Sequence, residues 1–367
     1  MISSIKKVKN ILKFTLNGID KKPVPVKLTW EVGMLCNSKC KYCQRWSVKD
    51  TSTDLTTEEG EVLLRQINEA GVSVISFSGG EPLLRDDIYH LISYAAGLGL
   101  TTSLISNGLL IDSEERATRL CSTGLDRICL SLDGPVPEVH DSIRGIKGGF
   151  EKVISAAHLL KKNRSGGKPK IYFNTTLSKE NIAEFKEITE LVHQMKVDGW
   201  AFQLVHEGSN ETLLFPEENI LVECDAVRKL HHDMKSMKSK YRALFVHYDG
   251  FYDNFVTYVD DKEKLYKYRC IAGTLAGTID PNGNVRVCIS TSYVLGNIRE
   301  KSFIEIWHSE KANEARQDIK NGECPLCWMC CYAPLTVFLS DVEKFRLHKI
   351  LSKPNIKNYL RMLKVVR

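Results

Sequence analysis

The segment Cys36-Asn37-Ser38-Lys39-Cys40-Lys41-Tyr42-Cys43 places three cysteines at spacings of four and three residues. A short loop with this spacing can aim three sulfurs at one centre, and three thiolates suit a [4Fe–4S] cluster that leaves one iron open. A small chelating ligand would bind at that open iron. Thiolates also hold zinc, but a zinc site would need a fourth Cys or His close by, and none follows until His90. The spacing therefore favours the iron–sulfur cluster.

Around this segment, short β-type runs alternate with helical patterns. A sheet of six parallel strands with right-handed crossovers curves into an open barrel, so the predicted fold class is α/β. In such barrels the chemistry lies at the carboxyl ends of the strands. We predict strands at residues 26–32, 72–77, 101–105, 127–132, 170–175 and 199–205, and helices at 57–70, 86–96, 113–121, 149–162 and 180–195.

The second predicted strand ends in Ser78-Gly79-Gly80-Glu81-Pro82. Two glycines allow the backbone to approach a ligand closely, and Glu81 can accept hydrogen bonds from an ammonium group. Taken alone, the four residues from Gly79 to Pro82 would read as a turn. Their place at a strand end favours a binding role.

The next strand ends also carry polar residues. Asn107 and Asp133 both precede a glycine, so a turn-forming role is an equal alternative to ligand binding at each of them. Asn174 ends the fifth strand and is a candidate of the same kind. His206 and Glu207 close the sixth strand, where they could face the substrate as an acid–base pair or simply form polar surface.

A second group of cysteines lies near the end of the sequence. Twelve cysteines without a secretory leader point to metal binding, because the cytosol keeps thiols reduced. A strand, a Pro-Asn-Gly-Asn turn and a returning strand bring Cys288 back beside Cys270, and Cys324 with Cys327 completes a four-thiolate site for zinc or an auxiliary [4Fe–4S] cluster.

Five further cysteines are left over. Cys330 or Cys331 could replace one of the four thiolates, and at least one of the two is expected to be free. Cys121, Cys129 and Cys224 stand alone in apolar patterns and are predicted to be small core residues.

The first cysteine segment with Tyr42 before its third cysteine, the Gly-Gly-Glu-Pro motif and the terminal cysteines together resemble the radical SAM enzymes with a C-terminal twitch domain, the shortened form of SPASM. The resemblance implies a partial (β/α)6 barrel followed by a small cluster-binding domain with a β-hairpin and helices. It also implies that S-adenosylmethionine (SAM) chelates the open iron and that the auxiliary site holds [4Fe–4S] rather than zinc. The ligands it implies are Cys36, Cys40 and Cys43 for the first cluster and Cys270, Cys288, Cys324 and Cys327 for the second.

The same resemblance assigns contacts to SAM. Tyr42 would lie against the adenine, and Gly79, Gly80 and Glu81 would hold the amino group. Arg144 would pair with the carboxylate, since an arginine fork suits one. The ribose would face Ser131 and nearby polar groups, among which we count Asn107, Asp133 and Asn174.

The implied reaction is stepwise. One electron, supplied by a reductase with a flavodoxin or a ferredoxin, cleaves SAM to methionine and a 5′-deoxyadenosyl radical. That radical takes a hydrogen atom from an unactivated C–H bond. The substrate radical then loses an electron to the auxiliary cluster or couples within the substrate.

We divide the sequence into a basic lead (1–25), a barrel (26–215), a helical connection (216–268), the twitch-type domain (269–335) and a basic C-terminal helix (336–367). The connection contains one long helical pattern from 215 to 240. An aromatic-rich stretch from 241 to 268 follows, whose side chains we expect in the core rather than along a substrate cavity.

Net charge is +6, and the excess lies at the two ends of the sequence. Residues 1–30 hold seven lysines and one aspartate, and residues 341–367 hold eight basic and two acidic residues. These ends could contact anionic lipid or a phosphorylated substrate, although solvated faces of terminal helices explain them more simply. A cytoplasmic protein is expected, because no apolar block of a signal peptide or membrane span occurs. We expect no nucleic-acid partner.

Three substrate classes remain open. A small polar molecule, such as an amino sugar or cyclitol, is what a twitch domain with one cluster implies. A peptide precursor is disfavoured, because too few residues precede the first strand for a peptide-docking domain. A lipid or isoprenoid is suggested only by the basic ends.

Overall fold

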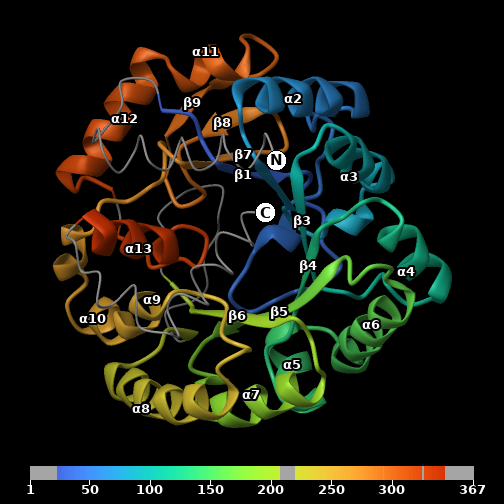
Figure 1. Ribbon diagram of the computed structural model, residues 1–367, viewed down its shortest axis with the longest axis vertical. Coiled ribbons are helices and arrows are strands. Elements are labelled where there is room, and N and C mark those ends of the chain that lie inside the picture. Colours follow the sequence, from blue (N-terminus) through green and yellow to red (C-terminus); the bar gives the residue numbers. More distant parts are fainter. Residues whose placement is uncertain (1–22, 207–219, 292, 325, 344–367) are drawn as a thin grey trace.

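The computed structural model describes residues 23–206, 220–291, 293–324 and 326–343 (Figure 1). Most of the basic lead, residue Glu207 and most of the basic C-terminal segment therefore lie outside the described residues. Within the described parts of the chain, no helix combines the length and the apolar character that crossing a membrane requires.

Six parallel strands form the barrel wall in the order β6-β5-β4-β3-β2-β1. Figure 1 shows them curving into an open ring with helices on its outer side. Each of the six predicted strands is confirmed, with ends that differ by at most two residues. The strands are β1 (Lys27–Glu31), β2 (Val74–Ser78), β3 (Thr101–Ser106), β4 (Arg127–Ser131), β5 (Lys170–Leu177) and β6 (Gly199–Leu204).

The sheet does not end at β1. Strand β7 (Ala276–Ile279) pairs with β1 in parallel register, with Leu28 opposite Gly277. The antiparallel strands β8 (Asn284–Arg286) and β9 (Val294–Asn297) follow. The C-terminal cysteine region is thus built on the same nine-stranded sheet as the barrel.

The helices cover the outer face of the sheet and the gap between its two ends (Figure 1). Helix α2 begins at a capping box made by Thr56 and Glu59, and Gly71 ends it in the left-handed conformation. The crossover helices are α2 (Thr57–Ala70), α3 (Ile88–Gly97), α4 (Glu114–Cys121), α5 (Pro137–Arg144), α6 (Gly149–Asn163) and α7 (Phe185–Gln194), and the later ones are α8 (Cys224–Tyr241), α9 (Asp249–Asp253), α10 (Phe255–Asp260), α11 (Phe303–Trp307), α12 (Glu310–Asn321) and α13 (Ala333–Glu343).

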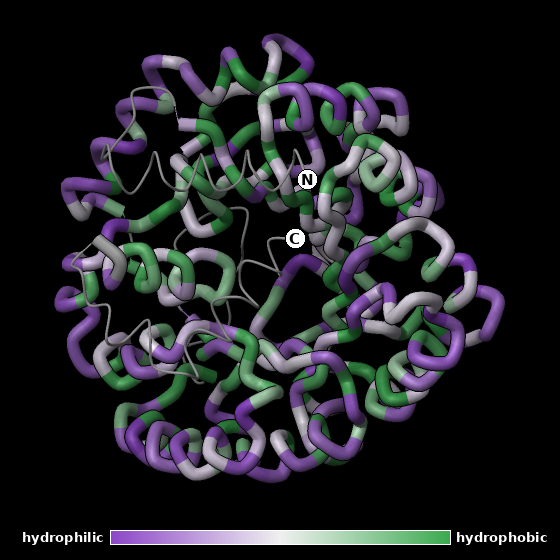
Figure 2. Tube along the Cα trace, in the orientation of Figure 1, coloured by the Kyte–Doolittle hydropathy of each residue, from purple (hydrophilic) through white to green (hydrophobic). Residues whose placement is uncertain are grey.

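The main core lies between the sheet and the helices, and Figure 2 shows apolar residues inside the ring and polar ones on its rim. The aromatic side chains of the connection belong to this core, as predicted. Tyr248, Phe251, Tyr252 and Phe255 are each at most 2% exposed. Phe202 of β6 stacks on Tyr252 with 4.6 Å between ring centroids, which fastens the connection to the barrel.

Arg299 makes a second link between the barrel and the C-terminal region. Its Nε and Nη2 bind Glu59 at 2.5 and 2.7 Å, at the start of α2. Its Nη1 donates to the carbonyl of Thr53 at 3.0 Å. These contacts hold the C-terminal region against the barrel.

One helix of the barrel was not predicted. Helix α5 (Pro137–Arg144) has proline in its first turn and ends at Gly145, whose φ is +62°. It lies next to the first cysteine segment and is important for the site described below.

Candidate functional site

The first cysteine segment follows β1 and is held by the end of α5. The backbone N–H of Lys39 donates to the carbonyl of Arg144 at 3.1 Å, and that of Lys41 to the carbonyl of Ile143 at 2.9 Å. A Cβ on Gly145 would lie 2.4 Å from the carbonyl oxygen of Lys39. Only glycine therefore permits this close approach of helix and loop.

The Gly-Gly-Glu turn after β2 contacts the same loop from another side. The N–H of Gly80 donates to the Gly33 carbonyl at 2.9 Å, and that of Glu81 to the Leu35 carbonyl at 2.8 Å. A Cβ on Gly79 would lie 2.2 Å from the oxygen of Gly33. The glycines are thus required by the approach of the loop backbone, a reason that the sequence did not reveal.

Glu81 is 3% exposed and links the ends of β2 and β3. Its carboxylate accepts hydrogen bonds from the Ser106 hydroxyl at 2.9 Å, the Asn107 N–H at 2.7 Å and the Leu83 N–H at 3.1 Å. Burial raises the pKa of Glu81 in spite of these donors. All three donors come from the chain itself.

Asn107 connects this corner to the cysteines. Its side-chain NH₂ donates to Asn37 at 2.7 Å and to Ser38 at 3.2 Å, and its carbonyl oxygen accepts from the Leu109 N–H at 3.0 Å. Asn107 therefore forms a turn and also anchors the cysteine loop.

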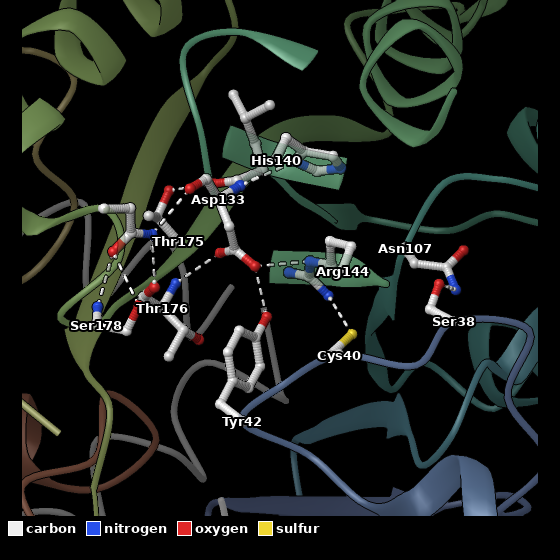
Figure 3. A network of polar contacts seen from close by, with 12 residues as sticks. Ser38, Cys40, Tyr42, Asn107, Asp133, His140, Arg144, Thr175, Thr176 and Ser178 are labelled. Carbon is white, nitrogen blue, oxygen red and sulfur yellow. Dashed lines mark hydrogen bonds and ion pairs between the residues drawn. The ribbon is translucent and has the colours of Figure 1, made fainter. Parts of the chain in front are cut away.

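Asp133 is the centre of a buried network that Figure 3 shows at close range. Its Oδ2 accepts from the Tyr42 hydroxyl at 2.5 Å and lies 2.6 Å from Nε of Arg144. Arg144 reaches Cys40 with Nη1 at 3.6 Å from the sulfur, and its guanidinium lies 5.5 Å from the centre of the Tyr42 ring. Burial opposes the charge of Arg144, yet Asp133, Tyr42 and Cys40 raise its pKa well above the ordinary value.

The other atoms of Asp133 are bonded too. Its Oδ1 accepts from the Thr176 N–H at 2.9 Å, and its carbonyl accepts from Asn181 at 2.8 Å. Its N–H donates to Nδ1 of His140 at 3.1 Å, which requires an unprotonated Nδ1. Burial lowers the pKa of His140 to about 4, which keeps that nitrogen free to accept.

The three cysteines open onto a cavity of about 170 Å³, which we call the cysteine-loop cavity. The side-chain oxygen of Asn174 is buried there without a hydrogen-bond partner among the described residues. Arg45, which the sequence analysis missed, is fixed by Glu31 and by the Gly79 carbonyl at 2.8 Å. The lining residues are Cys36, Ser38, Cys40, Tyr42, Cys43, Arg45, Ser78, Gly79, Gly80, Ile105, Ser106, Asn107, Ser131, Arg144, Asn174 and Thr176.

Most of the predicted SAM contacts border this cavity. Glu81 and Asp133 do not, because the chain itself engages their carboxylates. A signal for Arg45 was present in the sequence, since a basic residue two positions after Cys43 lies beside the expected cluster.

A second cavity of about 180 Å³ lies inside the barrel, and we call it the inner cavity. Ile105 and Asn174 line both cavities, so the two adjoin. The lining side chains come from alternate residues of the strands, as the two-residue period of a strand requires. They include Val26, Lys27, Val74, Ser76, Ser103, Ile105, Arg127, Cys129, Tyr172, Asn174, Ala201, Val246, His247, Ile271, Leu275, Cys330, Cys331, Leu335 and Phe338.

The predicted four-thiolate set of Cys270, Cys288, Cys324 and Cys327 gathers beside β7 and β8. Burial raises the pKa of Cys270 to about 12, and the neighbouring Cys288 and Cys324 add to that shift. Burial also raises the pKa of Cys327 well above its usual range. Among the described residues, no three such side chains converge on a point that suits a single ion.

Two of the leftover cysteines, Cys129 and Cys224, differ from their predicted placement in the core. Cys330 and Cys331 line the inner cavity, as does Cys129, which is therefore not a plain core residue. Cys224 lies at the start of α8, with its sulfur 3.5 Å from Asp260.

His206 lies at the end of β6 and lines neither of these two cavities. Burial lowers its pKa to about 4. Its proposed partner Glu207 lies outside the described residues, so the acid–base pair remains a prediction.

Comparison with known proteins agrees with this geometry. A model of the radical SAM superfamily matches residues 30–192, and a model of an iron–sulfur cluster-binding domain, SPASM, matches residues 270–332. Fe-coproporphyrin III synthase of Methanosarcina barkeri is 31% identical over 321 residues, covering 82% of this chain and 77% of the relative. AdoMet-dependent heme synthase of Oleidesulfovibrio alaskensis is 29% identical over 330 residues, covering 84% and 81%.

Among solved structures, SuiB of Streptococcus suis bound to S-adenosylmethionine has the same fold. The TM-score is 0.63 at 19% identity, and the match covers 84% of this chain and 71% of SuiB. The same protein bound to its precursor peptide SuiA gives a TM-score of 0.62.

Proposed function

Because this chain belongs to the radical SAM superfamily and carries a C-terminal SPASM iron–sulfur domain, we propose that it takes a hydrogen atom from an unactivated C–H bond of a small substrate held in the inner cavity. The enzyme binds SAM and a [4Fe–4S] cluster, and its C-terminal domain binds an auxiliary iron–sulfur cluster. The observation that carries the proposal is the shared wall of the two cavities at Ile105 and Asn174.

The residues of the cysteine-loop cavity fit these groups. Cys36, Cys40 and Cys43 supply three sulfurs, as an iron–sulfur cluster with one open iron needs. Burial raises the pKa of Cys36, and of Cys40 to about 11, so a bare thiolate is disfavoured there until a positively charged cluster compensates it. The unpartnered oxygen of Asn174 offers an acceptor to the polar ligand.

When bound, the cluster supplies the electron that cleaves SAM into methionine and a 5′-deoxyadenosyl radical. The chain's own residues orient SAM. We assign its amino group to the backbone of Gly79 and Gly80, its carboxylate to Arg144 and its ribose to Ser131 and Asn107. Tyr42 is assigned to the adenine.

In this proposal Glu81 and Asp133 do not contact SAM themselves but hold residues that do. Glu81 holds Asn107, and Asp133 holds Arg144 and Tyr42, by the hydrogen bonds and ion pair described above. Both carboxylates therefore orient the residues that contact SAM.

The inner cavity supports a substrate group of modest size with an acidic substituent. A cavity of about 150 Å³ holds a benzene-sized molecule, and the inner cavity is close to that volume. Its wall is mostly apolar, but the ammonium of Lys27 has no ion pair with a carboxylate among the described residues. A charge in apolar surroundings is costly unless it is paired, so a substrate carboxylate would be favoured there.

A second candidate is a larger substrate that inserts one group into this cavity. The relatives named above are a heme synthase and an Fe-coproporphyrin III synthase, and the PqqA peptide cyclase of Rhizobium meliloti is 29% identical over 309 residues. A carboxylate-bearing side chain of a tetrapyrrole or of a peptide would contact the same apolar wall of the inner cavity and the ammonium of Lys27.

The test is SAM cleavage by protein that has been reconstituted anaerobically and reduced with dithionite. We expect 5′-deoxyadenosine from the wild type and none from the variant in which Cys36, Cys40 and Cys43 are alanine. That variant should keep about four irons per chain, against about eight in the wild type. A triple variant that still cleaves SAM would refute the proposal.

Two further variants sharpen the test. Replacing Cys324 and Cys327 should leave uncoupled SAM cleavage intact, because the first cluster does not use them. Replacing Cys121 on α4 provides the matched control and should change neither iron content nor cleavage. Fe-coproporphyrin III, a synthetic acidic peptide and small acids can then be compared for their acceleration of 5′-deoxyadenosine release.

A further inference from the structure

Two adjacent thiols on the wall of the inner cavity have no role in the proposed function. Cys330 and Cys331 both line that cavity, three and four residues after Cys327. The thiols that act electrostatically on the pair are the two cysteines themselves and Cys129 of β4. Neither of them is among the four cysteines that we assign to the auxiliary cluster.

The segment that carries the pair is held firmly. The N–H of Cys330 donates to Oε1 of Gln203 on β6 at 3.0 Å. The next residue, Tyr332, shares a hydrogen bond of 3.0 Å with Thr278 of β7. The pair is thus fixed between the two ends of the barrel sheet.

The two sulfurs influence each other's ionisation. The interaction between the two adjacent sulfurs lowers the pKa of Cys331 and raises that of Cys330. The positive charges of Lys27 and Arg45 favour the same ionisation, and the carboxylate of Glu31 opposes it.

The location of the pair matters because Arg45, which acts on Cys331, also lines the cysteine-loop cavity. The two cavities share a wall, so a radical formed in one lies next to the contents of the other. The S–H bond is weaker than an ordinary C–H bond. The transfer of a hydrogen atom from a thiol to a carbon radical is therefore favourable in free energy. A reactive carbon radical beside this wall would therefore lie near a thiol from which it can take a hydrogen atom.

We propose that the Cys330–Cys331 pair donates a hydrogen atom to the substrate radical in the inner cavity and so quenches it. This inference rests on the proposed function. The 5′-deoxyadenosyl radical first takes a hydrogen atom from the substrate C–H bond. The substrate radical then forms a new C–H bond as the S–H bond of the pair breaks, leaving a sulfur radical.

One electron and one proton restore the thiol. The electron comes from the flavodoxin- or ferredoxin-class donor, and the proton comes from solvent. One turnover then consumes one SAM, two electrons and one proton, and the substrate is rearranged or inverted without net oxidation.

The experiment needs no substrate, because the 5′-deoxyadenosyl radical itself serves as the probe. Uncoupled SAM cleavage is run in D₂O, where S–H exchanges to S–D and C–H does not. Deuterium in the isolated 5′-deoxyadenosine is measured by mass spectrometry. We expect deuterated product from the wild type and loss of most of that deuterium in the double variant Cys330→Ser, Cys331→Ser, since a hydroxyl is a poor hydrogen-atom donor.

The controls separate the two proposals. Cys121→Ala should behave as the wild type. If the wild type cleaves no SAM, the proposed function fails. If it cleaves SAM but deuterium is absent, is equal in the double variant, or is lost instead in Cys129→Ser, the assignment of the pair is overturned.

A second measurement does not depend on turnover. The double variant should retain the iron and sulfide content of the wild type, because the pair is not a cluster ligand. Loss of about four irons per chain would make one of the two cysteines a ligand and would overturn the inference.

Discussion

At the scale of single residues, the side chain of Asp133 joins three parts of the site. It pairs with Arg144, accepts from Tyr42 and accepts from the backbone of Thr176. It is fully buried. Its carboxylate therefore fixes two of the groups that we assign to SAM.

Asp133→Asn should destabilise the protein strongly, because it leaves the buried charge of Arg144 without a carboxylate. Breaking a buried ion pair costs about 3–5 kcal/mol. The free energy of unfolding, measured anaerobically with denaturant, should fall by that amount. Tyr42→Phe removes only one hydrogen bond to a charged group, with an expected loss of about 1.5–3 kcal/mol. Equal losses in the two variants would contradict the central place of Asp133.

Glu81→Gln should loosen the corner between β2 and β3. The glutamate accepts from three donors, and the NH₂ of glutamine would face at least one of them. Leaving a buried donor unsatisfied costs about 1–3 kcal/mol, and denaturant unfolding should show that loss. Glu115→Gln, on the exposed face of α4, is the matched control and should leave the free energy of unfolding unchanged.

The sequence indicated which residue types lie at the strand ends but not which of them bind one another. Asp133 and Tyr42 are far apart in the chain, and nothing in either local pattern shows that they meet. The sequence also left the turn-forming and binding roles of Asn107 open, and the structure has it forming a turn while it anchors Asn37.

At the scale of elements, α5 is the part of the barrel that shapes the cysteine loop. Its last carbonyls accept the backbone N–H groups of Lys39 and Lys41. Gly145 permits that contact. A Cβ added at Gly148, three residues later, would have no atom within 4 Å. Both glycines have positive φ, at +62° and +75°.

Gly145→Ala should cost the protein its first cluster. The new Cβ would collide with the Lys39 carbonyl and displace the loop that carries Cys40. Iron per chain after reconstitution should fall from about eight to about four. Gly148→Ala has the same unfavourable φ, worth about 1–2 kcal/mol, without the collision. Its iron content should stay at the wild-type value, and a fall in both variants would show that φ alone is responsible.

The six barrel strands were predictable because each is a short apolar or alternating run between turn residues. Helix α5 was not, because its position depends on packing against the cysteine loop. The hairpin of β7 and β8 was predicted from its Pro-Asn-Gly-Asn turn. Its parallel pairing with β1 was not, since local pattern carries no information about so distant a partner.

At the scale of the whole molecule, buried histidines set the response to acid. Burial lowers the pKa of His140 and His206 to about 4 and that of His247 to about 3. In the unfolded chain the same groups take up protons near pH 6.5. Below that pH the unfolded state binds more protons than the folded state.

Stability should therefore fall as the pH is lowered through 6.5 toward 4. Each histidine contributes up to about 1.4 kcal/mol per pH unit in that range. The measurement is denaturant unfolding at neutral and at mildly acidic pH. His140→Asn should weaken the pH dependence, whereas His158→Asn, at an exposed position on α6, should not. An unfolding free energy that rises on acidification would contradict this account.

The parallel pairing of β1 with β7 has a consequence for how the protein is made. During translation Lys27 emerges long before Ala276, its partner in the sheet. At about 5–20 residues per second, the interval is roughly 10–50 s. The residues that surround the first cluster are all synthesised in that time, while one edge of β1 has no neighbour. A nascent chain with such an exposed strand edge is prone to mispairing until β7 has been made.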